Sequence, residues 1–143
     1  MKIEIREYKH GDLELILHEM DGKGSGRRQD KFKLVESSDA FCCYVAEENC
    51  KIKGFVIMED LRDGVSHYMV QINVAEKRKG IGRKLVEKVF EKIGEGGHIS
   101  LCVNSDNKEA IKFYEALGFK KSGFIEGYRK HQDKFWYSFD LCD

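Results

Sequence analysis

The chain contains no proline and no net charge, because 25 lysines and arginines balance 25 aspartates and glutamates. Without proline, glycine, asparagine and aspartate are left to mark the turns. The balanced charge argues against a general nucleic-acid binder, which would be basic as a whole. No apolar run approaches the roughly 20 residues that span a membrane. The charged, alternating start is typical of a strand and not of a signal peptide, so the cytoplasm is the expected location.

Paired cysteine motifs are also missing. The chain has five cysteines, an odd number, and none of them has Cys-x-x-Cys spacing. The adjacent Cys42 and Cys43 should point to opposite faces of a strand. This pattern favours reduced, partly buried thiols over a disulfide framework or a zinc site, so we expect no metal.

With 143 residues, 41% hydrophobic and 35% charged, the chain is expected to form one globular domain over residues 1–143. Period-two patterns predict strands at 2–8, 41–47, 52–59, 65–74, 98–103, 119–128 and 135–141. Apolar stripes at helical spacing predict helices over 12–20, 29–36, 81–93 and 107–117, the last one opened by an Asp106–Glu109 capping box. The mixture predicts a single α+β domain.

The most informative segment is the basic turn Lys77-Arg78-Lys79-Gly80-Ile81-Gly82-Arg83, which joins a predicted strand to a predicted helix. The first amides of a helix have no internal partner and carry partial positive charge, and glycine lets a phosphate approach them closely. The Walker pattern is absent, and the dinucleotide pattern fails at Leu85, where it needs glycine. The turn alone fits a phosphate site and an ordinary solvated turn equally well.

A second segment reads Leu101-Cys102-Val103-Asn104-Ser105-Asp106-Asn107-Lys108-Glu109-Ala110, followed by Phe113-Tyr114 and Gly118-Phe119. Asn107 and Tyr114 are seven residues apart, so two helical turns place them on one face. Each also has a plain structural interpretation, Asn107 as a helix-start residue and Tyr114 as a core aromatic.

In this order the two segments resemble those of the Gcn5-related N-acetyltransferase (GNAT) family, and the resemblance covers about residues 40 to 139. The coenzyme A signature of that family is Gln/Arg-x-x-Gly-x-Gly/Ala, which Lys77 to Gly82 match except at the first position. Lys77 keeps the positive charge at this position but lacks the planar guanidinium group of arginine. We therefore expect the backbone amides of the turn to contribute more of the binding than this side chain. The resemblance implies a mostly antiparallel, twisted central sheet with a splayed strand pair, flanked by about four helices.

The resemblance also implies the chemistry and the site. Acetyl-CoA is the expected co-substrate, and its acetyl group should pass directly to a primary amine of a small molecule or peptide. Tyr114 is the expected acid for the leaving thiolate, and a backbone amide should stabilise the oxyanion. The expected cofactor-binding residues are Val70, Gln71, Ile72, Lys77, Arg78, Lys79, Gly80, Ile81, Gly82, Arg83 and Asn107.

The general base is not identified by the sequence. The family branch that acetylates ribosomal-protein N-termini carries a glutamate one residue after the leucine, where this chain has Cys102. A thiol is a poor substitute for that carboxylate, which disfavours the same activity here. Glu59, Asp60 and His67 are the other candidates, and water can carry the proton instead.

Two further hypotheses stay open. A non-catalytic acyl-CoA sensor or interaction domain on the same fold would bind the cofactor without turnover, and a nucleotide-phosphate binder would prefer ATP or NAD. Residues 20–36 and 128–135 are expected to select the acceptor, because loop variation carries function in such folds. The aromatic last hairpin could also form a homodimer face.

Overall fold

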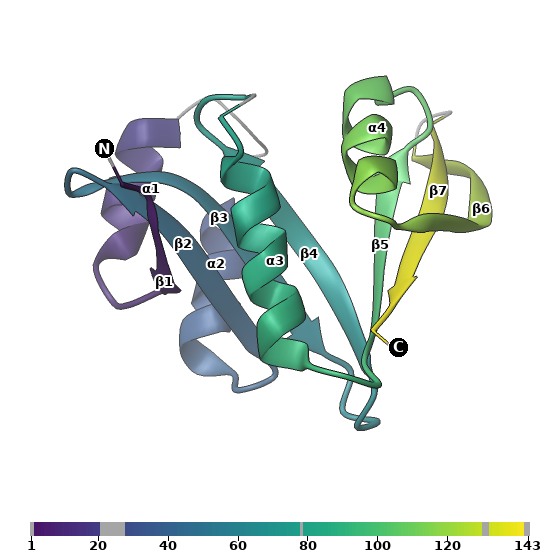
Figure 1. The fold of residues 1–143 in the computed structure, drawn as a ribbon, viewed down its shortest axis with the longest axis horizontal. Helices are drawn as coiled ribbons and strands as arrows, with labels where there is room; N and C mark the ends of the chain where they lie inside the picture. Colours follow the sequence, from purple (N-terminus) through teal and green to yellow (C-terminus); the bar gives the residue numbers. More distant parts are fainter. Residues whose placement is uncertain (1, 21–27, 78, 130–131, 142–143) are drawn as a thin grey trace. The chain divides into compact units, whose positions relative to one another are not determined.

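The computed structural model describes residues 2–20, 28–77, 79–129 and 132–141 and has a mixed α+β fold (Figure 1). Its strands are β1 (Glu4–Glu7), β2 (Phe41–Glu48), β3 (Lys51–Asp60), β4 (Ser66–Val74), β5 (His98–Asn104), β6 (Lys120–Arg129) and β7 (Gln132–Asp140). Its helices are α1 (Asp12–Met20), α2 (Arg28–Ser37), α3 (Ile81–Ile93) and α4 (Lys108–Ala116). The expected strands and the four expected helices are therefore present.

Hydrogen-bonded strands follow the order β1-β2-β3-β4-β5-β7-β6. The pairs β1/β2, β2/β3, β5/β7 and β6/β7 are antiparallel, whereas β4 and β5 run parallel. The parallel ladder is short and joins Ser66–Tyr68 to His98–Ser100. The predicted mostly antiparallel sheet is confirmed. The single domain stays a prediction, and the residue contacts fall into two compact units.

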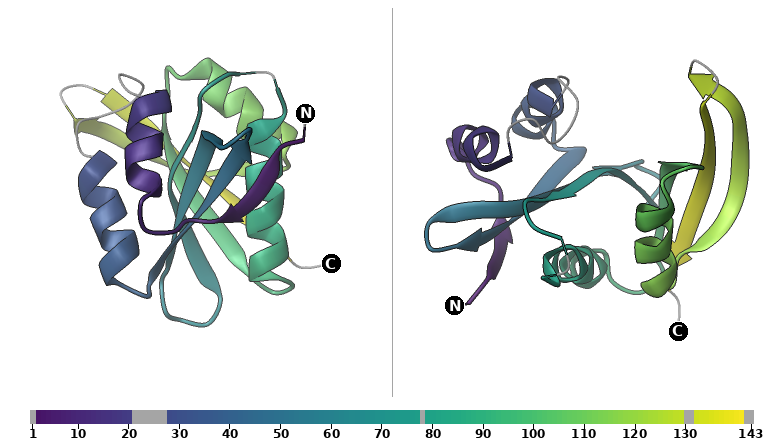
Figure 2. Two further views of the ribbon diagram at one scale, coloured as in Figure 1. Left: turned by 90° about the vertical axis from the view of Figure 1, so that its left-hand side faces the viewer. Right: turned by 90° about the horizontal axis from the view of Figure 1, so that it is seen from above.

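The first unit consists of residues 1–60 and 69–93. Its β2–β3 hairpin closes with a two-residue turn at Asn49 and Cys50. Both residues have positive φ, which such a turn needs in order to match the twist of the strands. Helices α1 and α2 cover one face of its strands and α3 covers the other (Figure 2). The face under α1 and α2 buries Ile16, Phe32, Cys43, Val45, Ile52, Phe55 and Ile57.

Buried charge ties β1 to α1 in this unit. Asp12 is only 1% exposed, and both of its carboxylate oxygens accept hydrogen bonds from Arg6, at 2.8 and 3.0 Å. Arg6 also donates to Glu47 of β2 at 2.6 Å. Burial alone would raise the pKa of Asp12, but the hydrogen bonds from Arg6 and from the Lys9 amide, together with the positive charge of Arg6, outweigh it and lower the pKa.

The second unit consists of residues 61–68 and 94–143. On β5 the side chains alternate, with Ile99, Leu101 and Val103 buried and the intervening residues half-buried. The buried face carries α4, because Tyr137, the cross-strand partner of Leu101, donates to Glu115 of α4 at 2.9 Å.

The end of α4 shows why glycine is needed at position 118. Gly118 has φ of 101°, and its amide donates to the carbonyl of Glu115 while the Phe119 amide donates to that of Tyr114. These two bonds form a Schellman cap, and the ring contact between Tyr114 and Phe119 supplies its hydrophobic part. A Cβ at Gly118 would also lie 2.9 Å from Phe139. Gly118 therefore ends α4 as a left-handed cap.

Two local predictions are wrong. The N-cap of α4 is Asn107 and not Asp106, so the third helical residue is Ala110, which has no side chain to complete a capping box. Strand β7 begins at Gln132 and not at residue 135, because Arg129 already pairs with Gln132. The polar residues 132–134 are the first residues of the strand.

Candidate functional site

The basic turn at the start of α3 is supported by β3. The amide of Ala75, just after β4, donates to the carbonyl of Lys53 at 2.7 Å. A Cβ on the neighbouring Gly54 would lie 3.0 Å from the carbonyl oxygen of Asn73 and 3.1 Å from the side chain of Ile81. Glycine at position 54 therefore lets the end of β4 and the first residue of α3 pack closely on β3. Gly54, a glycine inside a strand pattern, is the feature of the sequence that signals this close approach.

The N-terminus of α3 is open and basic. Gly80 precedes the helix with φ of 76°, and its carbonyl accepts the first helical bond from Lys84 at 3.1 Å. Glycine has no side chain that could cap the first amides, and the first turn contains no acidic residue. Lys79 and Arg83 are more than half exposed, and their ion pairs with Glu76 and Glu87 are long, at 3.8 and 3.9 Å. These features suit an anion such as a pyrophosphate.

The remaining residues of the predicted turn fit the same picture in part. Lys77 is exposed beside the turn, Ile81 is buried as its anchor, and Gly82 lies in the first turn of α3. Arg78 lies outside the described residues. Around Gly80 the described residues of the turn combine backbone amides with basic side chains, which is what a phosphate group needs.

The three β4 residues expected to pair with the cofactor arm are Val70, Gln71 and Ile72, all half-buried. Val70 packs against the core under α1 and α2. The side-chain oxygen of Gln71 accepts a hydrogen bond from Lys31 of α2 at 3.0 Å. Lys31 could not be predicted as part of the site, because a contact between residues 40 positions apart leaves no trace in local patterns. Backbone pairing of β4 with a cofactor stays a prediction.

In the second unit, Asn107 caps the N-terminus of α4, and Tyr114 lies seven residues later, in the C-terminal cap described above. The Asn107 oxygen accepts a hydrogen bond from the Ala110 amide at 3.2 Å, so its carbonyl caps the helix and its NH₂ group keeps its donors. Tyr114 is 9% exposed and contacts the rings of Phe113 and Phe119. Burial raises the pKa of Tyr114 from 10.0 to about 12, so its phenol stays protonated at neutral pH.

The candidate bases are divided between the units. Glu59 and Asp60 end β3 in the first unit. His67 is on β4 in the second unit and pairs with Ile99, so it shares the sheet face that carries α4 and Tyr114. Cys102 points to the other face, and burial raises the pKa of its thiol despite a hydrogen bond from Tyr68 and the charge of Lys134. A protonated thiol is a poor base, in line with the prediction for this position.

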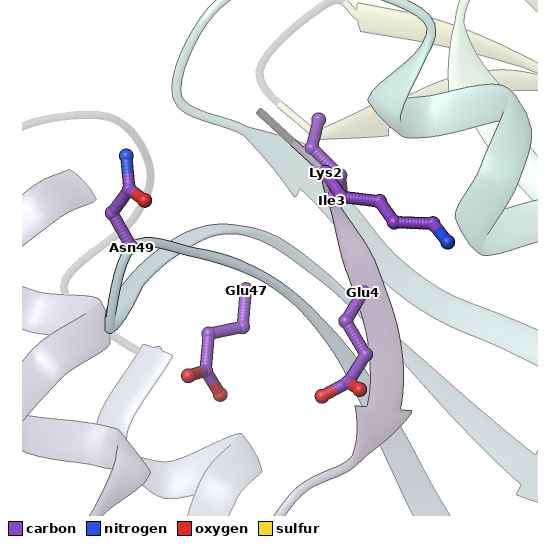
Figure 3. A pocket seen from close by; sticks show the side chains of 5 residues that line it. All are labelled: Lys2, Ile3, Glu4, Glu47 and Asn49. Carbon is purple, nitrogen blue, oxygen red and sulfur yellow. The ribbon is translucent and has the colours of Figure 1, made fainter.

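Other site types find little support in the described residues. Cys42, Cys43, Cys50 and Cys102 are free thiols, and no group of three or more His, Cys, Asp or Glu side chains in the described ranges could hold a metal ion. No helix among these residues is long and apolar enough to cross a membrane. A hollow beside β1 is lined by Lys2, Ile3, Glu4, Glu47 and Asn49 (Figure 3). Its two carboxylates would repel phosphate, and it shares no residue with the predicted site.

The family model of the acetyltransferase (GNAT) domain matches residues 39–121, which include β4, the basic turn, α3, β5 and α4. The chain belongs to the GNAT acetyltransferase family. A probable N-acetyltransferase, camello, from Xenopus laevis is 33% identical over 104 residues, covering 67% of this chain and 48% of its own. The [ribosomal protein bS18]-alanine N-acetyltransferase of Escherichia coli K12 is 28% identical over 83 residues, covering 57% of this chain and 56% of its own.

The chain thus spans about half the length of the curated relatives it matches. Solved GNAT structures agree with the fold over nearly the whole chain. The crystal structure of the ribosomal-protein-S18-alanine N-acetyltransferase from Escherichia coli has a TM-score of 0.82 at 19% identity, covering 99% of this chain and 96% of that one. At this identity the likeness establishes the fold and not the acceptor.

Proposed function

We propose that this GNAT chain is an acetyl-CoA-dependent N-acetyltransferase that transfers an acetyl group directly to a primary amine in a ternary complex. The observation that carries the proposal is the open, basic N-terminus of α3, at the position of the family's coenzyme A signature. The expected location is the cytoplasm. The relative that acts on the alanine of ribosomal protein bS18 does not define the acceptor here, because Cys102 replaces the glutamate of that branch.

The residues that bind the donor follow the family resemblance. The amides that follow Gly80 and the charges of Lys79 and Arg83 bind the pyrophosphate of acetyl-CoA. The backbone of Val70, Gln71 and Ile72 pairs with the pantetheine arm as an added strand would. Asn107 contributes its side-chain NH₂ group to the same arm, since its oxygen is engaged by the helix.

The chemistry is acyl transfer without an acyl-enzyme. The neutral amine attacks the thioester carbonyl, the new C–N bond forms, and the C–S bond breaks to release the thiolate. Tyr114 donates its phenolic proton to that sulfur and is reprotonated by solvent, while the amine loses one proton to water. The products are an acetamide and free coenzyme A, so atoms and charge balance. The raised pKa of Tyr114 ensures that the proton is present at neutral pH.

The proposal is tested by incubating the protein with acetyl-CoA and a panel of primary amines while the released thiol is measured. Binding is followed separately by the thermal shift with coenzyme A, ATP and NAD. We expect coenzyme A to raise the melting temperature, and at least one amine to release thiol at a rate proportional to enzyme concentration.

Three outcomes would change the conclusion. Binding of coenzyme A with no turnover on any amine would favour the non-catalytic sensor, which the loss of the branch glutamate at Cys102 keeps in view. Protection by ATP or NAD but not by coenzyme A would favour a nucleotide-phosphate binder. Absence of any shift with coenzyme A would remove the basis of the proposal.

A further inference from the structure

Among the described residues, one buried side-chain oxygen has no hydrogen-bond partner, and it belongs to Asn104 at the end of β5. The backbone around it is satisfied. The Asn104 carbonyl accepts from the Asn107 amide at 3.0 Å, and the Ser105 amide donates to the Asp133 carbonyl at 2.9 Å. Buried polar atoms nearly always have partners, so this oxygen calls for a donor from outside the chain, a ligand or a water.

Asn104 lies on the face of β5 that is turned away from α4, next to an ordered aromatic surface. Cys102, two residues earlier on the same face, stands opposite Trp136 of β7. The indole of Trp136 lies against Gly123 of β6, where a Cβ would come within 3.1 Å of the ring. Tyr68 meets the same indole edge-on, with ring centroids 6.0 Å apart, and hydrogen-bonds to Cys102. These contacts hold the indole in place before any ligand arrives.

The charge on this face bears on the protonation state of a ligand. Lys134 is the cross-strand partner of Asn104, and its charge is felt at Cys102, where it opposes the effect of burial on the thiol pKa. A second positive charge close to Lys134 is disfavoured. A neutral amine, which still has N–H donors, suits the Asn104 oxygen better than an ammonium group does.

Resting on the acetyltransferase function above, we propose that this face, formed by Cys102, Asn104 and Trp136, binds the acceptor. The acceptor lays a flat apolar group against Trp136 and donates an N–H of its neutral amine to the Asn104 oxygen. The terminal torsion of asparagine is broad, so a modest rotation turns the oxygen toward the arriving donor. Asn104 is then a positioning residue, and the preferred substrates are primary amines on flat, apolar groups.

The variant Asn104→Leu separates this role from a structural one. It keeps the approximate shape and removes the unsatisfied oxygen, so the melting temperature should stay unchanged or rise. With phenethylamine as acceptor, we expect its KM to rise about tenfold, with the KM of acetyl-CoA unchanged. Asn104→Asp keeps an acceptor oxygen and should restore most of the affinity. Ser100→Ala, on the same face of β5, is the matched control and should behave as the native enzyme.

Trp136 is the only tryptophan of the chain, which gives a readout independent of turnover. Phenethylamine, added to the protein with coenzyme A bound, should change its fluorescence, whereas putrescine should change it far less. Asn104→Leu should shift the phenethylamine titration about tenfold to weaker binding.

Two results would overturn the inference even in an enzyme that acetylates amines. Native acceptor KM in Asn104→Leu would mean that the oxygen holds only a water. A saturating substrate amine that leaves the Trp136 fluorescence unchanged would place the acceptor elsewhere. Absence of thiol release with every amine would instead contradict the proposed function, and the fluorescence titration would still decide whether this face binds amines.

Discussion

The helices α3 and α4 both follow a strand of the sheet, yet their N-termini are built in opposite ways. The start of α3 has Gly80 at its cap position, no acid in its first turn, and exposed Lys79 and Arg83 beside it. The start of α4 has Asn107 as a side-chain cap and Glu109 in its first turn. One helix leaves its amides and positive charge to an external anion, whereas the other satisfies them within the chain.

This difference indicates how the work is divided in a GNAT chain. A helix whose first amides are already capped, with an acid close by, has little to offer a phosphate. We therefore propose the α3 terminus as the pyrophosphate site, and Tyr114, two turns along α4, as the contribution of that helix. Burial of the Tyr114 phenol raises its pKa, so this side chain is suited to donate a proton and not to bind an anion.

The largest expected effect comes from the chemical role of α4. In Tyr114→Phe, kcat should fall about 100-fold, the lower range for loss of a general acid, while the Kd of coenzyme A stays nearly native. Steady-state kinetics and calorimetric titration measure the two quantities. Because the pKa of Tyr114 is raised to about 12, native kcat should not lose this acid between pH 7 and 10. A large loss of coenzyme A affinity would make Tyr114 mainly structural.

The next prediction tests whether the N-terminus of α3 binds the pyrophosphate. Gly80→Asp places a carboxylate where the pyrophosphate is expected, and we expect coenzyme A affinity to fall about 30-fold, the scale of a lost charge-assisted contact. Gly80→Asn is the matched control, since both residues tolerate the left-handed φ of 76° and only the aspartate is charged. Native affinity in both variants, measured by calorimetry, would show that the phosphate binds elsewhere.

A smaller effect concerns the support under the α3 terminus. In Gly54→Ala the new Cβ meets the Asn73 carbonyl at 3.0 Å, and we expect a loss of about 2 kcal/mol in the free energy of unfolding with weaker coenzyme A binding. Gly123→Ala is the control in the other unit, where the contact is the Trp136 side chain. Urea unfolding should show a milder loss there, and coenzyme A affinity should be native. Equal losses of affinity would mean general destabilisation.

The sequence predicted the elements because their patterns are local. The alternation of Ile99, Leu101 and Val103 reports a nearby constraint, and the strand predicted from it is present. The Lys31–Gln71 contact, the fit of Gly54 under Ile81 and the unpaired oxygen of Asn104 depend on residues far apart in the chain. Periodicity carries no information on such contacts, so the supports of the site could not be predicted even where its motifs could.

The N-cap residue of α4 could not be identified from the sequence, because two adjacent residues are suited to the position. Asp106 and Asn107 are both good N-cap residues, and Glu109 three positions after Asp106 favoured the wrong one. The structure assigns the cap to Asn107, the same residue that the family resemblance places on the coenzyme arm. Its two roles use different atoms of one amide, and this allows them to be separated by mutation.

The smallest expected effect concerns Asn107, whose helix-capping role can be separated from its proposed cofactor contact. Asn107→Ala should lower the free energy of unfolding by about 1 kcal/mol, because the Ala110 amide loses its partner. Asn107→Asp keeps a capping oxygen and should be as stable as the native chain, but it lacks the NH₂ donors and should bind coenzyme A several-fold more weakly. Urea unfolding and calorimetry measure the two effects on the same samples. If Asn107→Asp binds coenzyme A with native affinity, Asn107 serves only to cap the helix. The N-terminus of α4 would then bind nothing outside the chain, in contrast to the uncapped N-terminus of α3.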